Sequence, residues 1–445
     1  MSDVSSAVIS KLDSLIQSLP ACPAFADLIY HPSRNFTRNS KFGLLNTVHF
    51  VLAAGPTTLK NELRSFLPND ACITPGALVQ SRSKIKPDLF RHLFFEFNSL
   101  FTFEKTFKNC RLLAVDGCKL NIPYNPEDLS TLHKGRSKDD GTSGKGYNQL
   151  HLTTAYDILN SCYVDAVIKD ITLYNEPKAA AEIVSNYQGD SAIFIFDRGF
   201  EGANLFEYLN RNTKFIARVK DINCKNGLMR GLVFPSDDEF DIDVNLTFTN
   251  YNRKEYQNQK HKYKIIQKYQ EFDYLDENTH FYETTWRIVR FKVEDGYETI
   301  VTNLDRDEFS AEDIRYLYNL RWNIEISYRY LKYDIHLTSF ISRRKEFIHQ
   351  EIWAKLTMYN VASLITIRLE EKRENRKKKK HIHRINYSNA CHLIREAFKG
   401  VKRKGGVPPD LDDSIIRDTS PVRPGRKFAR SPHPHSYRAS NYRIY

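Results

Sequence analysis

The sequence lacks the features that would assign it to a membrane or to a disulfide- or zinc-stabilised class. No apolar run approaches the roughly 18 residues that a membrane span needs, and the first residues, MSDVSSAVIS, lack a basic segment followed by an apolar one. The seven cysteines are scattered without any C-x-x-C pair, so neither a disulfide framework nor a zinc site is indicated. We therefore expect a cytoplasmic protein with no membrane partner and with reduced, mostly buried cysteines.

Excess positive charge is also missing from most of the chain. The net charge is +12, yet the segment from Glu371 to Tyr445 alone carries 20 Lys and Arg against 7 Asp and Glu, which leaves −1 for the first 370 residues. A lysine run such as Lys377 to Lys380 is either a solvated tail or a contact for a polyanion, and its charge alone leaves both open. Beyond Gly405 the chain is rich in Pro, Ser, Arg and His, which predicts a flexible tail.

The length of 445 residues and the apolar content of 41% predict a folded protein of two or three domains with real cores. Changes of texture along the chain divide it further. We predict an N-terminal helical domain (1–105), an α/β core in two parts (106–219 and 297–370), a β-rich insertion between them (220–296) and a basic C-terminal region with a flexible tail (371–445).

Short helices are predicted in the N-terminal hundred residues. Ser40 can cap a helix with apolar residues at helical spacing that stops at Gly55-Pro56. A second helix begins at Thr74-Pro75, a cap residue followed by proline, and runs past Arg82 toward Ile85. A helix, a turn and a basic helix are compatible with DNA binding, but many small helical subdomains look the same.

The texture changes to β-type runs from Arg111 onward. The predicted order is β-β-β-α-β-α-β, with strands at 112–115, 150–156, 162–168, 192–196 and 214–219 and helices at 176–187 and 201–209. Three antiparallel strands followed by crossover helices and parallel strands form a mixed sheet with helices on both faces, as in ribonuclease H-like nucleases. The predicted fold class is therefore α/β, with a ribonuclease H-like mixed-sheet core interrupted by a β-rich insertion, an N-terminal helical domain and a C-terminal helical, basic region.

The insertion alternates apolar and polar residues. FDIDVNLTF (240–248), KYKII (262–266) and FYETTWRIVRFKV (281–293) predict strands, and nothing between Lys220 and Gly296 looks helical. Helical texture resumes at Ala311, continues through Lys332, and returns from 345 to 370.

Two aspartates directly follow predicted strands. Asp116 precedes a glycine, Asp197 stands in FDRGF, and either alone is more often a turn residue than a ligand. Both are expected at strand ends of one sheet, and a later helix supplies Glu325 as a third carboxylate. Converging carboxylates repel one another unless cations offset the charge. Hard oxygen ligands favour Mg²⁺ or Mn²⁺, and two such ions can activate water or a 3′-hydroxyl and stabilise the leaving oxygen of a phosphodiester.

The most specific pattern is Y-x2-R-x3-E-x6-K, formed by Tyr318, Arg321, Glu325 and Lys332. On a helix, steps of 3, 4 and 7 put these side chains on one face. Such a stripe can hold a metal ion while clamping phosphates on either side of a scissile bond. The alternative is an ordinary salt-bridged helix with an i,i+4 pair from Arg321 to Glu325.

Together with the Asp-Gly and DRGF segments, this pattern resembles the insertion sequence 4 family of bacterial DDE transposases over roughly Phe36 to Leu364. The resemblance implies that two aspartates and the helical glutamate bind the metals, that the arginine and lysine contact DNA phosphates, and that the tyrosine assists at the transposon end. It places these roles on Asp116, Asp197, Glu325, Arg321, Lys332 and Tyr318. The family also has a β-rich insertion between the second aspartate and the glutamate.

Two features depart from the family pattern. Family members usually continue the first motif as Asp-Gly-Thr or Asp-Gly-Ser, whereas Cys118 stands here, which puts any hydroxyl contact at that position in doubt. In relatives, an aromatic residue of the insertion stacks on a base flipped near the cut. Tyr297 and Trp286 are the candidates for this role, although an aromatic residue in a β-domain is more often part of the core.

The resemblance implies a cut-and-paste DNA transposase that holds two Mg²⁺ or Mn²⁺ ions per active site. As a homodimer it would bind the inverted ends of a bacterial insertion sequence, cleave them and join the 3′-hydroxyl ends to double-stranded target DNA, in the bacterial cytoplasm and on the nucleoid when bound to DNA. Two alternatives stay open: a metal-dependent nuclease on the same fold, and a catalytically idle DNA-binding protein descended from a transposase.

Overall fold

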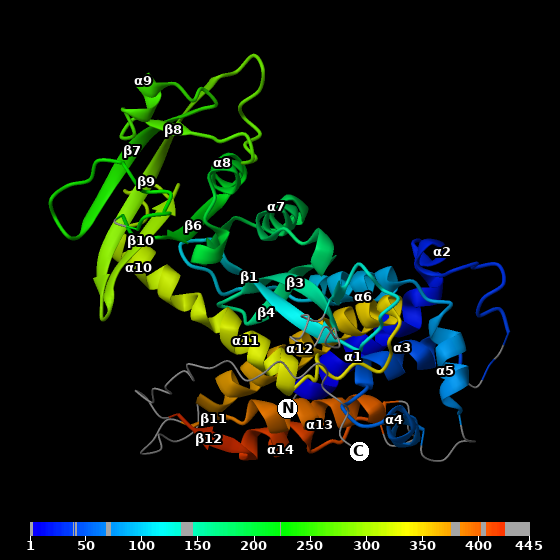
Figure 1. The fold of residues 1–445 in the computed structure, drawn as a ribbon. Helices are drawn as coiled ribbons and strands as arrows, with labels where there is room; N and C mark the ends of the chain where they lie inside the picture. The colour runs from blue at the N-terminus through cyan, green and yellow to red at the C-terminus, as the bar shows by residue number, and fades with distance from the viewer. Residues whose placement is uncertain are drawn as a thin grey trace, which may run out of the picture.

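The largest element of the fold is one mixed sheet of ten strands with helices on both faces (Figure 1). The computed structural model describes residues 3–38, 40, 42–67, 73–134, 146–222, 224–374, 383–401 and 406–422. The strands of this sheet are β1 (Arg111–Ile122), β2 (Leu132–His133), β3 (Tyr147–Asp157), β4 (Cys162–Asp170), β5 (Ala192–Phe196), β6 (Lys214–Val219), β7 (Phe240–Thr249), β8 (Tyr263–Ile265), β9 (Phe281–Val293) and β10 (Gly296–Thr302).

The first half of the sheet has the predicted strand arrangement. β3 pairs antiparallel with both β1 and β4, whereas β5 pairs parallel with β1 and β6. β5, with the sequence AIFIF, is buried along its whole length, as expected for a parallel strand that is covered on both faces. The prediction of three antiparallel strands followed by parallel strands is confirmed for this half.

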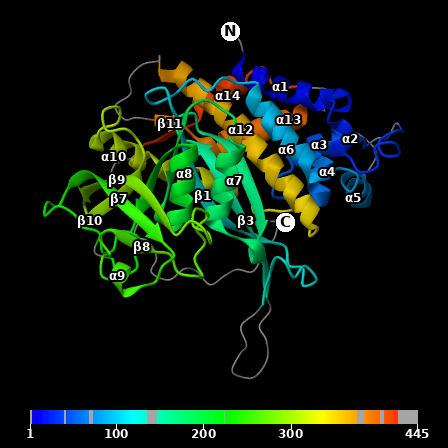
Figure 2. The same cartoon turned by 90° about the horizontal axis from the view of Figure 1, so that it is seen from above.

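The other half of the sheet comes from the insertion. β10 pairs antiparallel with β6, and β9, β7 and β8 follow in that order, so the insertion continues the sheet of the core (Figure 2). The strands predicted at 240–248, 262–266 and 281–293 are confirmed. The expectation that nothing here is helical is wrong, because α9 (Lys254–Gln257) forms one helical turn.

Two sets of helices cover the two faces of the core sheet. α7 (Glu176–Asn186) and α8 (Ala203–Asn212) lie on one face, and α10 (Ala311–Leu320), α11 (Trp322–Tyr333) and α12 (Lys345–Glu374) lie on the other (Figure 1). Side chains of β1 alternate between the two faces. Leu113 and Val115 pack with α7 and α8, whereas Leu112 and Ala114 pack with α11 and α12.

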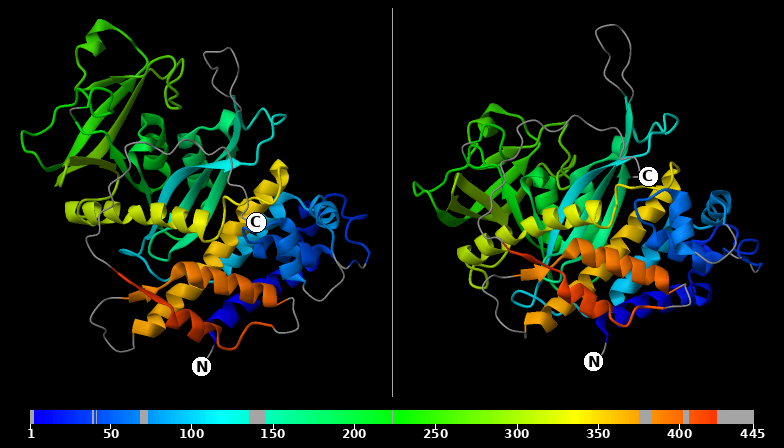
Figure 3. Two further views of the ribbon diagram at one scale, coloured as in Figure 1. Left: turned by 60° about the horizontal axis from the view of Figure 1, so that its bottom comes forward. Right: turned by 90° about the horizontal axis from the view of Figure 1, so that it is seen from below.

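Helices from both ends of the chain pack around α12, which is 30 residues long (Figure 3). The described helices of this part are α1 (Val4–Ser18), α2 (Phe25–Leu28), α3 (Leu44–Ala53), α4 (Leu59–Phe66), α5 (Pro75–Arg82), α6 (Pro87–Ser99), α13 (Tyr387–Gly400) and α14 (Leu411–Arg417). Short 3-10 turns also occur at η1 (Leu19–Ala21), η2 (Ile171–Leu173) and η3 (Arg198–Phe200).

One predicted N-terminal cap is confirmed and the other is wrong. Thr74 caps α5, since its side chain accepts a hydrogen bond from the amide three residues on, but this helix ends at Arg82 rather than continuing to Ile85. Gly43, not Ser40, directly precedes α3. The Ser40 hydroxyl accepts a hydrogen bond from the amide two residues on and so stabilises a turn before the helix.

The prediction of a flexible tail beyond Gly405 is wrong for residues 406–422. This segment contains α14 and the strand β12 (Thr419–Pro421), which pairs with β11 (His383–Ile385). The Asp412 carboxylate accepts hydrogen bonds from the amides of Val4 and Ser5, at 2.7 and 2.9 Å, and so ties this segment to the start of α1. The lysine run from 377 to 380 and residues 423–445 lie outside the described residues.

Two predicted boundaries near the candidate site also differ. β1 does not end before Asp116 but continues to Ile122, because its second half pairs with β3. The single helix expected from Ala311 to Lys332 is divided at Arg321, whose amide bonds to the carbonyl three residues back rather than four.

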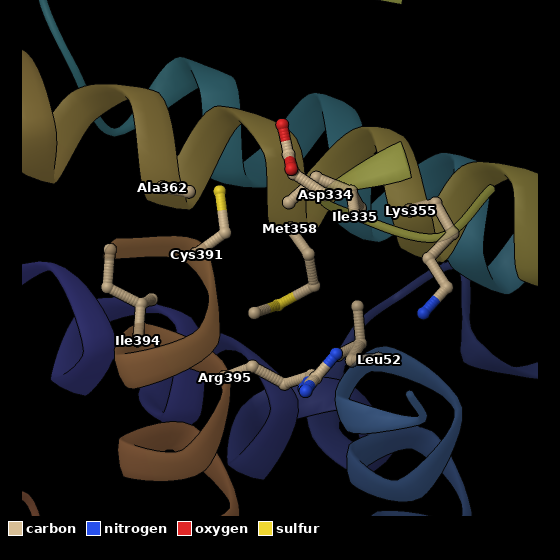
Figure 4. A pocket seen from close by; sticks show the side chains of 9 residues that line it. All are labelled: Leu52, Asp334, Ile335, Lys355, Met358, Ala362, Cys391, Ile394 and Arg395. Atoms are coloured by element: carbon tan, nitrogen blue, oxygen red, sulfur yellow. The ribbon is translucent and has the colours of Figure 1, made fainter. Parts of the chain in front are cut away.

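A small cavity marks the junction between the end of α11 and the helical part of the molecule (Figure 4). Its volume of about 10 Å³ leaves room for about one water molecule. Asp334, Lys355, Cys391 and Arg395 contribute to its lining. Burial raises the pKa of the Cys391 thiol, and the Asp334 carboxylate adds to this rise. The cavity therefore lies where the residues that follow α11 come close to α3, α12 and α13.

The described cysteines fit the expectation of reduced residues. Cys110, Cys118, Cys162 and Cys391 are buried free thiols, whereas Cys22 and Cys224 are more accessible and Cys72 lies outside the described residues. Among the helices that the structure describes, none combines the length and apolar character needed to cross a membrane.

Candidate active site

Asp116 and Asp197 lie side by side where the pairing of two parallel strands ends. β1 and β5 pair up to Val115 opposite Phe196, so each aspartate is the next residue along its chain. Val115 and Phe196 pack toward α7 and α8. Because extended backbone alternates its side chains, and Asp197 is still extended, both aspartates point to the opposite face, which α11 covers.

Three side chains from α10 and α11 reach this point. The Tyr318 hydroxyl donates a hydrogen bond to Oδ1 of Asp197 at 3.3 Å, and Nη2 of Arg321 donates to Oε1 of Glu325 at 3.0 Å. Arg321 is 3% exposed, and its Nε finds no hydrogen-bond acceptor in the described part of the chain. The structure thus brings together two carboxylates from the sheet, one from the helix, and a buried guanidinium with an unused donor.

The carboxylates are close enough to influence one another. The pKa of Asp116 is raised to about 6, mainly by burial, and the negative charges of Asp197 and Glu325 add to the rise. The Gly117 amide, which donates to the Asp116 carboxylate at 2.8 Å, and the Arg321 guanidinium oppose this rise. The site therefore concentrates negative charge, only part of which Arg321 offsets.

Lys332, near the end of α11, lies beside Cys118, which is two residues after Asp116 on β1. Burial raises the pKa of the Cys118 thiol to about 11, and the nearby Lys332 ammonium opposes this rise. The Lys332 ammonium is also 5.7 Å from the ring centre of Tyr328. Tyr318, Arg321 and Glu325 therefore lie near the point where β1 and β5 stop pairing, and Lys332 lies farther on, beside Cys118.

The sequence did not single out Tyr328 or Arg218. The Tyr328 hydroxyl donates to the backbone carbonyl of Asp116 at 2.7 Å and lies 2.8 Å from Oγ1 of Thr154. Burial raises the pKa of Tyr318 to about 12, while Arg321 and Arg218 lower it. Tyr328 could have been found from the sequence, because it follows Glu325 by three residues and so lies on the same face of the helix. Arg218 of β6 could not, because only the fold brings it to this site.

The two candidates for base stacking lie on the neighbouring strands β9 and β10. Trp286 is 1% exposed, and its ring nitrogen donates to the buried carboxylate of Glu207, so its ring belongs to the core. Tyr297 is half-buried, and the Arg290 guanidinium lies 3.8 Å from its ring centre. The burial of Trp286 argues against a stacking role in this conformation, and the role stays a prediction for both residues.

The donor set suits a hard divalent cation. Carboxylate oxygens are the ligands that Mg²⁺ and Mn²⁺ prefer, and a cation would offset the mutual repulsion that adds to the effect of burial on the pKa of Asp116. Within the described ranges, no group of three or more His, Cys, Asp or Glu side chains is arranged to hold a metal ion. The carboxylates thus fit the chemistry of such an ion, whereas the side-chain positions of the described site do not enclose one.

Comparison with known proteins identifies the family. The family model described as "Transposase DDE domain" matches residues 110–361, more than half of the chain. Transposase InsG for insertion sequence element IS4 of Escherichia coli (strain K12) is 21% identical over 393 residues, which cover 83% of this chain and 79% of that protein. Putative transposase InsL for insertion sequence element IS186A, from the same strain, is 36% identical over 61 residues, and the chain spans only 16% of its length.

Among solved structures, the piggyBac transposase in a synaptic complex with hairpin DNA is similar with a TM-score of 0.42 and 8% identity, over 98% of this chain and 85% of that one. The family match, by contrast, includes both aspartates, the glutamate and the whole Tyr-Arg-Glu-Lys pattern within its range. The chain therefore belongs to the DDE transposases, and within them to the family of insertion sequence 4.

Proposed function

We propose that the protein is a DNA transposase with a ribonuclease H-like catalytic core. In this proposal it binds the inverted ends of a bacterial insertion sequence, cleaves them by metal-dependent hydrolysis and transfers the 3′-hydroxyl ends into target DNA. The observation that carries the proposal is the meeting of Asp116, Asp197 and Glu325 with the buried Arg321 at the point where β1 and β5 stop pairing.

Asp116, Asp197 and Glu325 are the residues that would hold two Mg²⁺ or Mn²⁺ ions. When bound, such ions make water or a 3′-hydroxyl a stronger nucleophile and stabilise the charge on the leaving oxygen. The remaining contributions come from the chain itself. Tyr318 fixes the orientation of the Asp197 carboxylate by its hydrogen bond, and the Tyr328 hydroxyl holds the backbone of Asp116.

Cationic side chains supply the contacts to phosphate. The Nε donor of Arg321 is unused and buried, so it would reach a phosphate oxygen only once the side chain turns toward bound DNA. Charge-assisted hydrogen bonds of this kind are stronger than neutral ones. Lys332, beside Cys118, supplies a second positive charge on the same helix. Phosphoryl transfer depends mainly on positioning and charge neutralisation, so two cationic residues and three carboxylates are sufficient in principle.

The insertion offers a further surface for double-stranded DNA. Between Asn250 and Gln270 the chain has six Lys and Arg residues and a single acidic one. The side chains of Arg253, Lys254, Lys260, Lys262 and Lys268 are exposed. A cluster of exposed cations favours contact with the phosphate backbone, a contribution that weakens as salt rises. In the proposal, two copies of the chain hold two transposon ends, and the insertion contributes to end binding.

The test uses DNA from the ends of the element, identified as inverted repeats that flank the reading frame. Asp116→Asn and Glu325→Gln are expected to abolish cleavage and joining while end binding in a gel-shift assay is kept, because each removes one carboxylate charge without changing side-chain size. Cleavage that persists in either variant would contradict the proposal. A strand-transfer assay with a supercoiled target separates a transposase from a nuclease, and a wild-type chain that binds ends but never nicks them would indicate an idle DNA-binding protein.

A further inference from the structure

Two glycines beside the catalytic aspartates face the same carboxylate, that of Glu176, which has no role in the proposed mechanism. Gly117 follows Asp116, and a methyl group added to it would lie 2.4 Å from Cε1 of His151 and 2.6 Å from Oε1 of Glu176. Both distances are too short for real contacts. Gly117 has no positive φ, so this position requires glycine because of the space that Glu176 and His151 occupy rather than because of its backbone conformation.

The second glycine meets the same side chain. A methyl group on Gly199, two residues after Asp197, would lie 3.7 Å from Oε2 of Glu176, which is an ordinary contact distance. One carboxylate therefore lies between the two segments that carry the catalytic aspartates. Glu176 is the first residue of α7, so it reaches the end of the sheet from the face opposite to Glu325.

Glu176 lies beside the buried ring of His151 and the half-buried ring of Tyr174. The ring of Tyr174 stacks on the ring of His151 with centres 3.4 Å apart and an angle of 17°. Burial raises the pKa of Tyr174, and the Glu176 carboxylate adds to this rise, which places the phenol beside the carboxylate. Its position at the start of a helix also favours a negative charge, because the helix dipole is positive there.

We infer that Glu176 is a positioning residue that holds the Asp116-Gly117 and Arg198-Gly199 backbones at a fixed separation. Its charge, placed behind the catalytic carboxylates, also strengthens their attraction for divalent cations. The inference rests on the proposed function, because it assumes that Asp116 and Asp197 hold such ions. Groups that support metal ligands from outside typically contribute about 10- to 100-fold to metal affinity.

The test measures Mn²⁺ binding by the full-length protein without DNA, using electron paramagnetic resonance. Glu176→Gln keeps the size of the side chain and removes its charge, and is expected to weaken Mn²⁺ binding about tenfold. It should also raise, by a similar factor, the Mg²⁺ concentration at which end nicking is half-maximal. Glu182→Gln is the matched control, because Glu182 lies on the same helix and pairs with Lys169 at the surface. This control should bind Mn²⁺ like the wild-type chain.

Glu176→Asp keeps the charge on a shorter side chain and is expected to bind Mn²⁺ more tightly than Glu176→Gln, which a purely steric role does not predict. If Glu176→Gln does not fold, as judged by thermal unfolding, Glu176→Asp still tests the positioning role, because its shorter side chain should weaken Mn²⁺ binding relative to wild type. Mn²⁺ affinity unchanged from wild type in a folded Glu176→Gln chain would overturn the inference. If the wild-type chain binds Mn²⁺ but never nicks transposon ends, the proposed function fails while the inference is still decided by the Mn²⁺ affinities.

Discussion

At the scale of single residues, Asp116 is a carboxylate that the fold makes costly to ionise. Its pKa is raised from 3.8 to about 6, mainly by burial, so the folded state binds this proton more tightly than the unfolded state. The associated stability is fully present below about pH 4 and is lost as pH rises through about 6. We expect Asp116→Asn to raise the free energy of unfolding of the metal-free protein at about pH 8, by up to about 3 kcal/mol, because the amide carries no charge.

Urea denaturation in the presence of EDTA measures this effect at about pH 8 and again at about pH 5, where the gain should be smaller. Asp237→Asn, at an exposed aspartate of the insertion, is the control and should leave stability unchanged. Added Mg²⁺ should stabilise the wild-type chain more than Asp116→Asn. Equal stability of wild type and Asp116→Asn at the higher pH would contradict the raised pKa.

Trp286 gives a second prediction, on stability rather than catalysis. The buried Glu207 carboxylate accepts hydrogen bonds from the ring nitrogen of Trp286, from the Tyr282 hydroxyl at 2.9 Å and from the Thr284 hydroxyl at 3.0 Å. Trp286→Phe removes one of these donors and leaves a void. The expected cost is roughly 1–3 kcal/mol in the free energy of unfolding, with little change in end binding below the unfolding transition.

Denaturation curves and gel shifts on the same preparations check this prediction. Tyr297→Phe, which keeps the ring that lies against Arg290, is the comparison and should unfold close to wild type. The core role of Trp286 is refuted if Trp286→Phe keeps full stability but loses contact with bases at the transposon end.

At the scale of elements, helices and strands determined by neighbouring residues can be predicted from the sequence, whereas strands that form only by pairing with distant segments cannot. The strand from Ala192 to Phe196 is predictable because five consecutive apolar residues suit only a buried strand in this context. The second half of β1 is not, since its polar residues become a strand only by pairing with β3. The spacing of the helical residues reveals Arg321 and Glu325, whereas Glu176 gains its place by contacts with residues far away in sequence.

Arg82 of α5, which the sequence suggested as part of a DNA-contacting helix, is instead bound to α12. It is 1% exposed and donates hydrogen bonds to the side chains of Gln350 and Glu351 and to the carbonyl of Phe347. Its charge therefore stabilises the helical part rather than facing DNA. Arg82→Met should lower the free energy of unfolding by about 3–5 kcal/mol, because it leaves Glu351 buried without its partner.

The double variant Arg82→Met with Glu351→Gln separates the lost charge pair from simple loss of packing. Removal of the second charge should restore a measurable part of the stability lost in Arg82→Met, as a double-mutant cycle would detect. The expected coupling fails if the double variant is as unstable as the sum of the two single changes.

At the scale of the whole molecule, the proposed active site lies between two parts that face different directions. The insertion extends the sheet on one side of the core, and the helical part packs around α12 on the other (Figures 1 and 3). A duplex bound to both parts would run across the core, where β1 and β5 stop pairing beside Asp116 and Asp197. End binding and catalysis can then use separate surfaces. This separation is why Asp116→Asn and Glu325→Gln are expected to keep end binding while they lose cleavage.

The distribution of charge along the chain gives the last prediction. Residues 423–445 contain six Lys and Arg and no Asp or Glu, in a chain whose first 370 residues carry a net charge of −1. We expect a chain ending at Val422 to bind all DNA sequences more weakly, because fewer phosphates are neutralised and fewer counterions released. The slope of log affinity against log salt should fall by between about 1 and about 5. A full-length chain with these six residues changed to glutamine should behave like the truncated one, and an unchanged salt slope in both would show that this charge is only solvated.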